Sequence, residues 1–220
     1  CNIRDREECV EAMRLLARLH GDLTFTPVFP EVEGVPAPAI DRYLPSRDYE
    51  KHNRELKRAR RFLKQRSQKT WFEIRLSAVI DPFLEEARQL SEEWKEIETT
   101  AGNRGEEPLC FCHGDYQYHN ILRQDRGFFL VNFEKCQADG PVRDLYLLLR
   151  KLLEKCEWDT EWGRVLLAAY ESVRPLKPYE RQDLFYRLSY PEKLWKIVNF
   201  YYNSGKAWIP EKNQEKLDRL

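Results

Sequence analysis

The sequence predicts a mainly helical α+β fold, and three observations support that prediction. Apolar residues recur at helical spacing through most of the 220 residues. The pattern becomes that of short strands only between residues 109 and 133. Glycine-containing turns bound this region, at Gly102 to Gly105 before it and at Asp139-Gly140-Pro141 after it. We therefore expect one domain, with room for a subdomain, in which a small β region lies between helices.

The first helix is expected over residues 5–20. Asp5 can cap its N-terminus, and Glu8 stands at the capping-box position. One apolar stripe recurs at steps of four, three and four, and should be buried: Cys9, Met13, Leu16 and His20. Gly21 is expected to end the helix.

Residues 23–47 contain five prolines and show no helical period, so we expect a loop there. A loop of this length in a compact domain is usually functional or ordered by its surroundings. The alternative is a flexible linker. Four side chains favour packing over a linker: Phe25, Phe29, Ile40 and Tyr43.

Two long helices follow, over residues 48–68 and 70–98. The first is basic, with nine Lys or Arg and one acid between Lys51 and Lys69. The second carries an apolar stripe and an acidic outer face, and Pro82 should kink it. We favour antiparallel neighbours with complementary solvated faces over a basic helix that grips an anionic partner, because a charge run usually marks a solvated face.

The β region and the last helices follow in order. Residues 109–112 form a strand candidate, and residues 120–123 and 127–133 form a hairpin. Helices are expected from Pro141 onward and near 160–172, 178–189, 191–203 and 211–219. Four large aromatics near the end should pack on the core rather than form a free tail: Trp195, Tyr201, Tyr202 and Trp208.

Composition excludes several classes of protein. There are 37 basic and 37 acidic side chains, so no net charge drives the chain toward nucleic acid. No apolar run approaches the roughly 18 residues of a membrane span. The first residue is Cys1 rather than Met, which suggests a segment of a longer chain. The six cysteines lack a paired spacing, so we expect reduced thiols of a cytosolic protein.

The chemistry is concentrated in residues 112–122, where a polar run rich in His, Asp and Asn lies between two apolar strands. Asp115 and Asn120 are five residues apart across this loop. If the hairpin turns at Asp125 and Arg126, Asn120 lies opposite residue 131 or 132, so Asn132 comes within about one residue of it.

This arrangement suits phosphoryl transfer. A carboxylate must accept the proton of the attacking hydroxyl, and amide and carboxylate oxygens must hold Mg²⁺ against the phosphates. The corresponding sequence signature is an H-x-D-x-x-x-x-N pattern, followed by a hairpin and an acidic D-F-[GDE] tripeptide.

Three alternatives remain open from the residues alone. Asp115 and Asn120 can simply cap a loop. A zinc site could form from two cysteines and two histidines, although no C-x-x-C spacing supports it: Cys110, Cys112, His113 and His119. Cys112 and His113 could act as nucleophile and base, but adjacent residues rarely face each other.

A family resemblance joins these pieces. The segments His113-Gly114-Asp115 through Asn120, Val131 to Glu134 and Val142 to Leu145 resemble the aminoglycoside/choline-kinase-like phosphotransferases. The chain is similar, more closely, to the bacterial spore-coat kinase-like proteins. Further matching segments are Leu16 to His20, Tyr190 to Ile197, Tyr201 to Asn203 and Ala207 to Asn213. The resemblance covers nearly the whole chain and implies the large C-terminal lobe of a kinase-like fold, over residues 1–220, with a small catalytic β-hairpin.

The resemblance also implies roles for individual residues. Asp115 would be the catalytic base, with His113 orienting the loop. Asn120 would be a Mg²⁺ ligand. Asp144 would be a buried carboxylate that braces the loop from the following helix.

Two departures from the family pattern bear on activity. Asn132 stands where the family has a metal-binding Asp, so Mg²⁺ and ATP binding should weaken. Glu134 could compensate if the strand continues and places both side chains on one face. The nucleotide-binding N-terminal lobe, with its Gly-rich loop and phosphate-pairing Lys, would lie before Cys1.

The sequence therefore leads to two functional hypotheses. We favour a kinase-like protein associated with the spore coat, a pseudokinase with weak or lost catalysis. The other is an active ATP- and Mg²⁺-dependent kinase for a hydroxyl of a small molecule. The partners would be a small-molecule substrate or other coat proteins, and the location the mother-cell cytoplasm or the spore coat.

Overall fold

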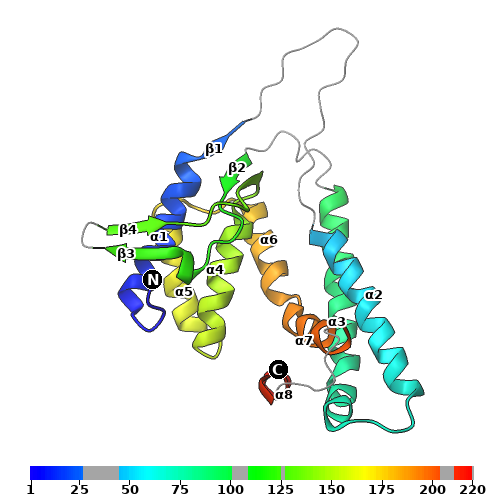
Figure 1. Cartoon of the computed structure of the whole chain (residues 1–220). Helices are drawn as coiled ribbons and strands as arrows, with labels where there is room; N and C mark the ends of the chain where they lie inside the picture. The colour runs from blue at the N-terminus through cyan, green and yellow to red at the C-terminus, as the bar shows by residue number, and fades with distance from the viewer. Residues whose placement is uncertain (27–44, 101–108, 125–126, 204–210, 220) are drawn as a thin grey trace. The chain divides into compact units, whose positions relative to one another are not determined.

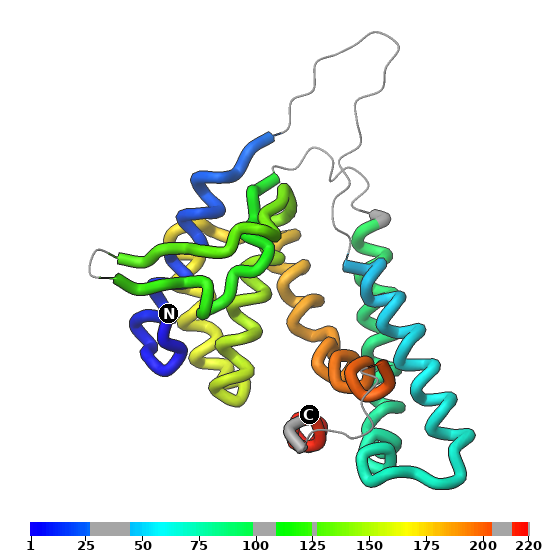
Figure 2. The backbone as a smooth tube through the Cα atoms, viewed as in Figure 1, coloured from blue at the N-terminus to red at the C-terminus, as the bar shows by residue number. Residues whose placement is uncertain are grey.

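The computed structural model describes residues 1–26, 45–100, 109–124, 127–203 and 211–219. The chain divides into two compact units. Unit 1 comprises Cys1–Tyr43 and Asn103–Leu188, and unit 2 comprises Leu44–Gly102 and Ser189–Leu220. Figures 1 and 2 show the path of the chain through each unit.

Unit 1 begins with helix α1, Arg6–Asp22. Asp5 caps it by accepting hydrogen bonds from the backbone N–H groups of Glu7 and Glu8, as predicted. Glu8 accepts from the N–H of Asn2, three residues before the N–H of Asp5 that a capping box would use. The prediction that Gly21 ends the helix is wrong: Gly21 lacks a positive φ, and the intrahelical bonding pattern continues to the N–H of Leu23.

The core of unit 1 forms where α1 packs against two later helices, α4 (Val142–Lys155) and α5 (Thr160–Glu171). The predicted stripe of α1 is confirmed, since all four of its residues are buried: Cys9, Met13, Leu16 and His20. Tyr116 from the loop after β2 and Ile121 from the hairpin are also fully buried in this core. The loop and the hairpin are therefore anchored to the same helical core.

The β structure of unit 1 is small and antiparallel. A three-stranded sheet has the order β1 (Thr24–Phe25), β2 (Leu109–Cys112), β5 (Gln137–Asp139). A separate hairpin pairs β3 (Ile121–Gln124) with β4 (Gly127–Leu130). The predicted bounds of β2 are confirmed, whereas β1 and β5 are too short for a sequence pattern to reveal. The hairpin strand ends three residues earlier than predicted because Asn132 has φ 66°, which extended backbone does not accommodate.

Helix α6 (Pro178–Ser189) completes the helices of unit 1, and a single 3₁₀ turn, Tyr118–Asn120, leads into β3. In α6 Glu180 is buried and pairs with Arg174, whose guanidinium lies 2.7 Å from its carboxylate. Three of the side chains expected to pack in the loop at 23–47 lie outside the described residues: Phe29, Ile40 and Tyr43. Phe25 does pack, stacked on Phe111 with ring centroids 4.8 Å apart.

Unit 2 is built on two long antiparallel helices, α2 (Pro45–Gln65) and α3 (Trp71–Thr100) (Figure 1). Their charged faces are complementary, as predicted: Arg60 of α2 bonds Asp81 of α3, and Lys95 lies 2.6 Å from Glu50. Helix α3 continues through Pro82. Helices α7 (Glu192–Asn203) and α8 (Glu211–Asp218) pack against this pair.

Three aromatic side chains of α7 pack against the core of unit 2, as predicted: Trp195, Tyr201 and Tyr202. Trp195 stacks on His52 with centroids 3.5 Å apart, and its indole N–H donates to Glu55 at 2.6 Å. Tyr201 stacks on Phe72 at 4.4 Å. Tyr202, also within this core, makes an edge contact with Phe62. Trp208 lies outside the described residues.

Candidate functional site

The loop that follows β2 is held in place by the buried carboxylate of Asp144. Asp144 lies in the first turn of α4 and is completely inaccessible to solvent. Its two oxygens accept hydrogen bonds from the backbone N–H of His113 at 2.5 Å and of Gly114 at 2.9 Å. A buried carboxylate requires such partners. The predicted burial and bracing of the loop by Asp144 are confirmed.

His113 ties the loop to the hairpin. Its ring is buried, and Nε2 donates to the carbonyl of Val131 at 2.9 Å. Nδ1 accepts from the backbone N–H of Asp115 at 3.3 Å. These partners fix the ring orientation and the tautomer, so the arrangement matches the orienting role expected for His113.

Gly114 allows the loop to pass close to the chain after the hairpin. Its φ is +78°, a conformation that L side chains rarely adopt. A Cβ here would lie 2.0 Å from the backbone carbonyl oxygen of Lys135. Glycine is therefore required for the close approach that brings residues 113–115 against residues 131–135.

Asp115 is the most exposed of the three loop residues, with 23% of its side chain accessible. One carboxylate oxygen lies 2.9 Å from Nζ of Lys135, and the other accepts from the side-chain amide of Gln117. The Lys135 ammonium is the main cause that holds the pKa of Asp115 below its usual value. The candidate base is thus ionised at neutral pH, paired with a cation, and weaker than an ordinary carboxylate.

Asn120 and Asn132 meet through the hairpin register. Ile121 pairs with Leu130, and the N–H of Val131 donates to the carbonyl of Asn120 at 3.1 Å. The side-chain amide of Asn132 then donates to Oδ1 of Asn120 at 2.8 Å. Asn120 in turn donates to the backbone carbonyl of Asp115 at 2.9 Å. The structure therefore brings the side chains of Asn120 and Asn132 together, as the strand spacing predicted, and joins Asn120 to the backbone of Asp115.

Glu134 does not lie on a strand together with Asn132, contrary to our prediction. The prediction that Asn132 and Glu134 share one face of a continuing strand is wrong, because β4 ends at Leu130 and Asn132 adopts positive φ. Glu134 is exposed in the turn that follows. Its suggested part in metal or nucleotide binding stays a prediction.

Sequence reasoning missed two partners of the candidate base. No sequence pattern indicates that Lys135 and Gln117 contact Asp115. Lys135 lies outside the motif at 113–120, and Gln117 is neither a charged nor a catalytic position within it. The zinc alternative does not form from the histidines that were considered. His113 bonds backbone groups through both ring nitrogens, and His119 is exposed. The residue that joins Cys110 and Cys112 is His20, from α1.

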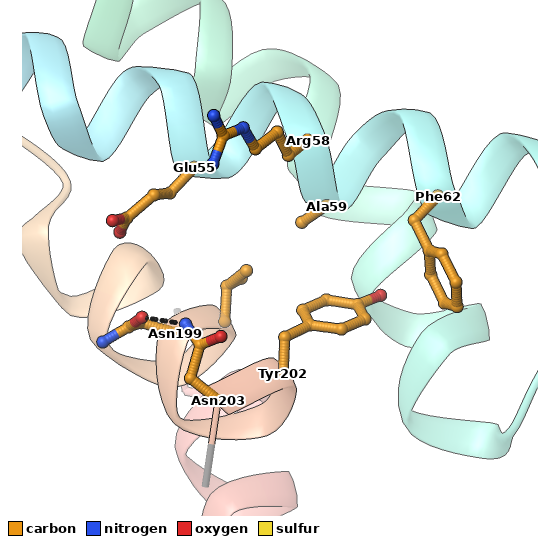
Figure 3. Close-up of a pocket in the computed structure, with 8 residues that line it drawn as sticks. Glu55, Arg58, Ala59, Phe62, Asn199, Tyr202 and Asn203 are labelled. Atoms are coloured by element: carbon orange, nitrogen blue, oxygen red, sulfur yellow. Dashed lines mark hydrogen bonds between the residues drawn. The ribbon is translucent and has the colours of Figure 1, made fainter. Parts of the chain in front are cut away.

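A separate hollow of about 340 Å³ lies in unit 2, between α2 and α7 (Figure 3). Its lining consists of Glu55, Arg58, Ala59, Phe62, Val198, Asn199, Tyr202 and Asn203. Asn203 donates to Asn199 across one end of the hollow, and the phenol of Tyr202 points toward Phe62. None of these residues belongs to the motif at 113–144.

The sequence profile of the phosphotransferase enzyme family matches residues 3–179. The chain belongs to this family. The predicted α+β, kinase-like fold is confirmed by that match and by a solved aminoglycoside phosphotransferase from Alicyclobacillus acidocaldarius. That structure superposes with a TM-score of 0.80 at 18% identity, over 99% of this chain and 62% of the other.

Two further relatives extend the comparison. Spore coat protein S of Bacillus subtilis is 34% identical over 112 residues, which is 50% of this chain and 32% of that protein. The match thus spans about a third of the length of this relative. A glucosamine kinase, solved in complex with glucosamine, ADP and inorganic phosphate, superposes with a TM-score of 0.50 at 16% identity, over 99% of this chain and 54% of that one. In the described part of this chain, none of the helices combines the length and the apolar character that a membrane span requires.

Proposed function

We propose that this chain is the large C-terminal lobe of a kinase-like protein associated with the spore coat, in which phosphotransferase activity is weak or lost. The family and the fold support the first half of the proposal, and the similarity to spore coat protein S supports the coat context. In this proposal residues 1–220 act with a nucleotide-binding lobe that precedes them. The protein works in the mother-cell cytoplasm or in the coat itself, with other coat proteins as its partners.

One contact carries the second half of the proposal: the hydrogen bond of 2.8 Å from the Asn132 amide to Oδ1 of Asn120. The family resemblance implies an Asp in place of Asn132. A metal held by both side chains would need both oxygens to face it, so binding must break this contact. Breaking it is not offset by a negative charge on either side chain, because both amides are neutral. The expected result is weak binding of Mg²⁺ and of the nucleotide that it accompanies.

The donor set toward a metal is correspondingly poor. Asn120 and Asn132 would hold Mg²⁺ through neutral amide oxygens, with Glu134 the carboxylate nearest in sequence. When bound, the metal supplies positive charge that offsets the charge of the phosphates. Magnesium prefers carboxylates and phosphates to neutral donors. The residues therefore allow a site for Mg²⁺ and ATP, but not a strong one.

The state of Asp115 supports reduced catalysis independently. A catalytic base must be free to accept the proton of the attacking hydroxyl. Here Lys135 and Gln117 occupy both oxygens of the carboxylate. The hydroxyl would have to share one of these oxygens with Lys135 or Gln117. The lowered pKa also decreases the driving force for proton transfer.

The second candidate function is an active kinase for a hydroxyl of a small molecule. The observation that favours it is the intact brace from Asp144 to the backbone of His113 and Gly114. This brace and the His113 contacts fix the loop that carries Asp115, which supports a role for Asp115 as a base. In this case an acceptor hydroxyl replaces Lys135 beside Asp115, and catalysis survives on Asn120 and Asn132.

Calorimetry with Mg²⁺–ATP decides between these functions, on the protein that carries this chain with its nucleotide-binding lobe. Asn132→Asp should tighten binding by about ten- to a hundredfold, on the order of 1–3 kcal/mol, because it adds a negative charge beside a divalent cation. Asp115→Ala is the matched control, and should leave binding nearly intact because a base acts on the hydroxyl. Tight binding by the parent, without gain from Asn132→Asp, would favour the active kinase. Absence of binding in both proteins would leave a structural role in the coat.

A further inference from the structure

A compact group of three metal-ligating side chains lies in the core of unit 1, away from the solvent. His20 comes from the last turns of α1, and Cys110 and Cys112 come from β2. One ligand atom from each residue lies within 4.8 Å of the other two. All three residues have no measurable exposure. The site is assembled from segments about 90 residues apart, so its position depends on the fold and not on a local motif.

The backbone explains why the two thiols meet. Residues at i and i+2 of a strand point to the same face, so Cys110 and Cys112 both face α1. Neither thiol has a strong partner. The Sγ of Cys110 lies 3.7 Å from the carbonyl of His20, and that of Cys112 lies 3.4 Å from the carbonyl of Gly140. Both sulfurs therefore retain capacity for a stronger ligand interaction.

The imidazole of His20 supplies an independent indication of a ligand. Nδ1 lies 2.8 Å from the hydroxyl of Tyr170. Nε2 is buried and has no hydrogen-bond partner within the described part of the chain. Its nearest ionised group is the carboxylate of Asp144, at 3.7 Å, which is already bonded to the loop. A buried polar atom without a hydrogen-bond partner is unfavourable. We therefore expect Nε2 of His20 to bind a group that accepts its lone pair or its proton.

We propose that His20, Cys110 and Cys112 are the three protein ligands of a buried site for Zn²⁺, with a water in the fourth position. Two thiolates and one imidazole suit this borderline-soft cation better than Mg²⁺. Two thiols release their protons as they bind, and the two thiolate charges neutralise the cation. The site is then electrically neutral, which burial requires. In the tautomer that binds the metal, Nδ1–H of His20 donates to the hydroxyl of Tyr170, 2.8 Å away, and Nε2 is free to bind the metal.

The distances are compatible with this assignment. Zinc bonds of about 2.3 Å to sulfur and about 2.0–2.1 Å to nitrogen place ligand atoms roughly 3.3–3.8 Å apart. The most distant pair in the group must therefore close by up to roughly 1.5 Å, which χ1 rotations of the cysteines provide. The metal would join the end of α1 to β2, directly before His113. This role in stability does not depend on the proposed function.

The first experiment measures zinc per chain by mass spectrometry of the metal, after expression in zinc-supplemented medium and washing with a chelator. We expect about one zinc per parent chain, because a buried site exchanges slowly. Cys112→Ser and His20→Gln should each lower the content by at least about tenfold. Cys136→Ser and His119→Gln are the matched controls, since both residues are exposed, and they should retain full zinc.

A second measurement keeps the proposal testable if the ligand variants do not fold. The parent is refolded with Co²⁺, and the absorption spectrum is recorded. Thiolate-to-cobalt charge-transfer bands and strong visible bands of tetrahedral cobalt are expected, and they should be absent when excess Zn²⁺ is present during refolding with Co²⁺. A parent without zinc and without thiolate bands would overturn the site. Loss of zinc in Cys136→Ser equal to that in Cys112→Ser would overturn it as well.

Discussion

The side-chain amide of Asn132 donates a hydrogen bond of 2.8 Å to the side-chain oxygen of Asn120, across the base of the hairpin. This contact joins the residue that should ligate a metal to the residue that departs from the family pattern. It also uses the positive φ of Asn132, at 66°, which asparagine tolerates better than most residues. An amide pair thus stabilises an arrangement that a carboxylate would need a cation to hold.

Asn132→Asp should make the stability of the chain depend on Mg²⁺. Without the cation we expect a loss of about 1 kcal/mol in the free energy of unfolding, because a carboxylate cannot donate to Oδ1 of Asn120. Added Mg²⁺ should restore stability by bridging the two oxygens. Thermal unfolding with and without Mg²⁺ measures the effect, and the midpoint of the variant should rise more than that of the parent.

The matched control is Asn132→Gly. Glycine accepts φ 66° without strain and has neither the amide nor a charge. It should lose the hydrogen bond and gain nothing from Mg²⁺. Equal Mg²⁺ responses in the parent and in Asn132→Asp would show that position 132 does not contact a metal.

Gly114→Ala should destabilise the protein strongly, by more than about 2 kcal/mol. Positive φ alone costs a non-glycine residue about 1–3 kcal/mol. Here the new Cβ would also meet the carbonyl oxygen of Lys135 at 2.0 Å, so the loop or the turn must move. Denaturant unfolding measures the loss.

Two other glycines separate the two causes. Gly127 has φ 127° with no atom within 4 Å of a Cβ, so Gly127→Ala reports the backbone cost alone. Gly140 has neither feature, and Gly140→Ala should change stability little. A loss at Gly114 no greater than that at Gly127 would show that the approach to Lys135 is not tight.

Much of this fold follows from local sequence patterns. The helices have long apolar stripes and clear start signals, as with Asp5, and their bounds are predicted to within a few residues. The prediction that Gly21 ends the helix failed because a glycine that ends a helix usually adopts positive φ. Tertiary packing, and not the residue type, sets that angle. The strands of two and three residues, Thr24–Phe25 and Gln137–Asp139, are too short to carry a period and exist through pairing with β2.

The site was predictable where the motif constrains it. Asp144 and His113 could be placed because the family resemblance implies that both hold this loop, and a buried carboxylate needs hydrogen-bond partners. Lys135 could not, since its contact with Asp115 depends on how the chain turns after β4, and that turn follows from the φ of Asn132. The grouping of His20 with Cys110 and Cys112 was equally hidden, because it requires the packing of α1 against the sheet. Long-range packing, rather than residue type, decides such contacts.

Asp144→Ala should lower the free energy of unfolding by roughly 2–4 kcal/mol, because it leaves two buried N–H donors, those of His113 and Gly114, without an acceptor. Asp144→Asn keeps one oxygen acceptor and should cost less. Asp218, a partly exposed residue paired with Arg75, provides the surface control, and Asp218→Ala should have little effect. Thermal and denaturant unfolding give the comparison, and an unfolding curve unchanged by Asp144→Ala would refute the brace.

Lys135→Gln should raise the pKa of Asp115 toward the ordinary value of about 3.9. The hydrogen bond from Lys135 is the largest cause of the lowered pKa, and the bond from Gln117 remains in the variant, so the rise should be partial. A depressed carboxyl pKa contributes stability above the unfolded pKa and loses it as pH falls through the folded pKa. The parent should therefore be more stable than Lys135→Gln at neutral pH, and the difference should vanish in acid.

Carboxyl-carbon NMR titration measures the pKa of Asp115 directly, with Lys151→Gln as a control at a lysine that pairs with Glu154 instead. If Asp115 titrates at the same pH in the parent and in Lys135→Gln, the lysine does not pair with the candidate base in solution, and Asn132 would be the remaining cause of weakened catalysis.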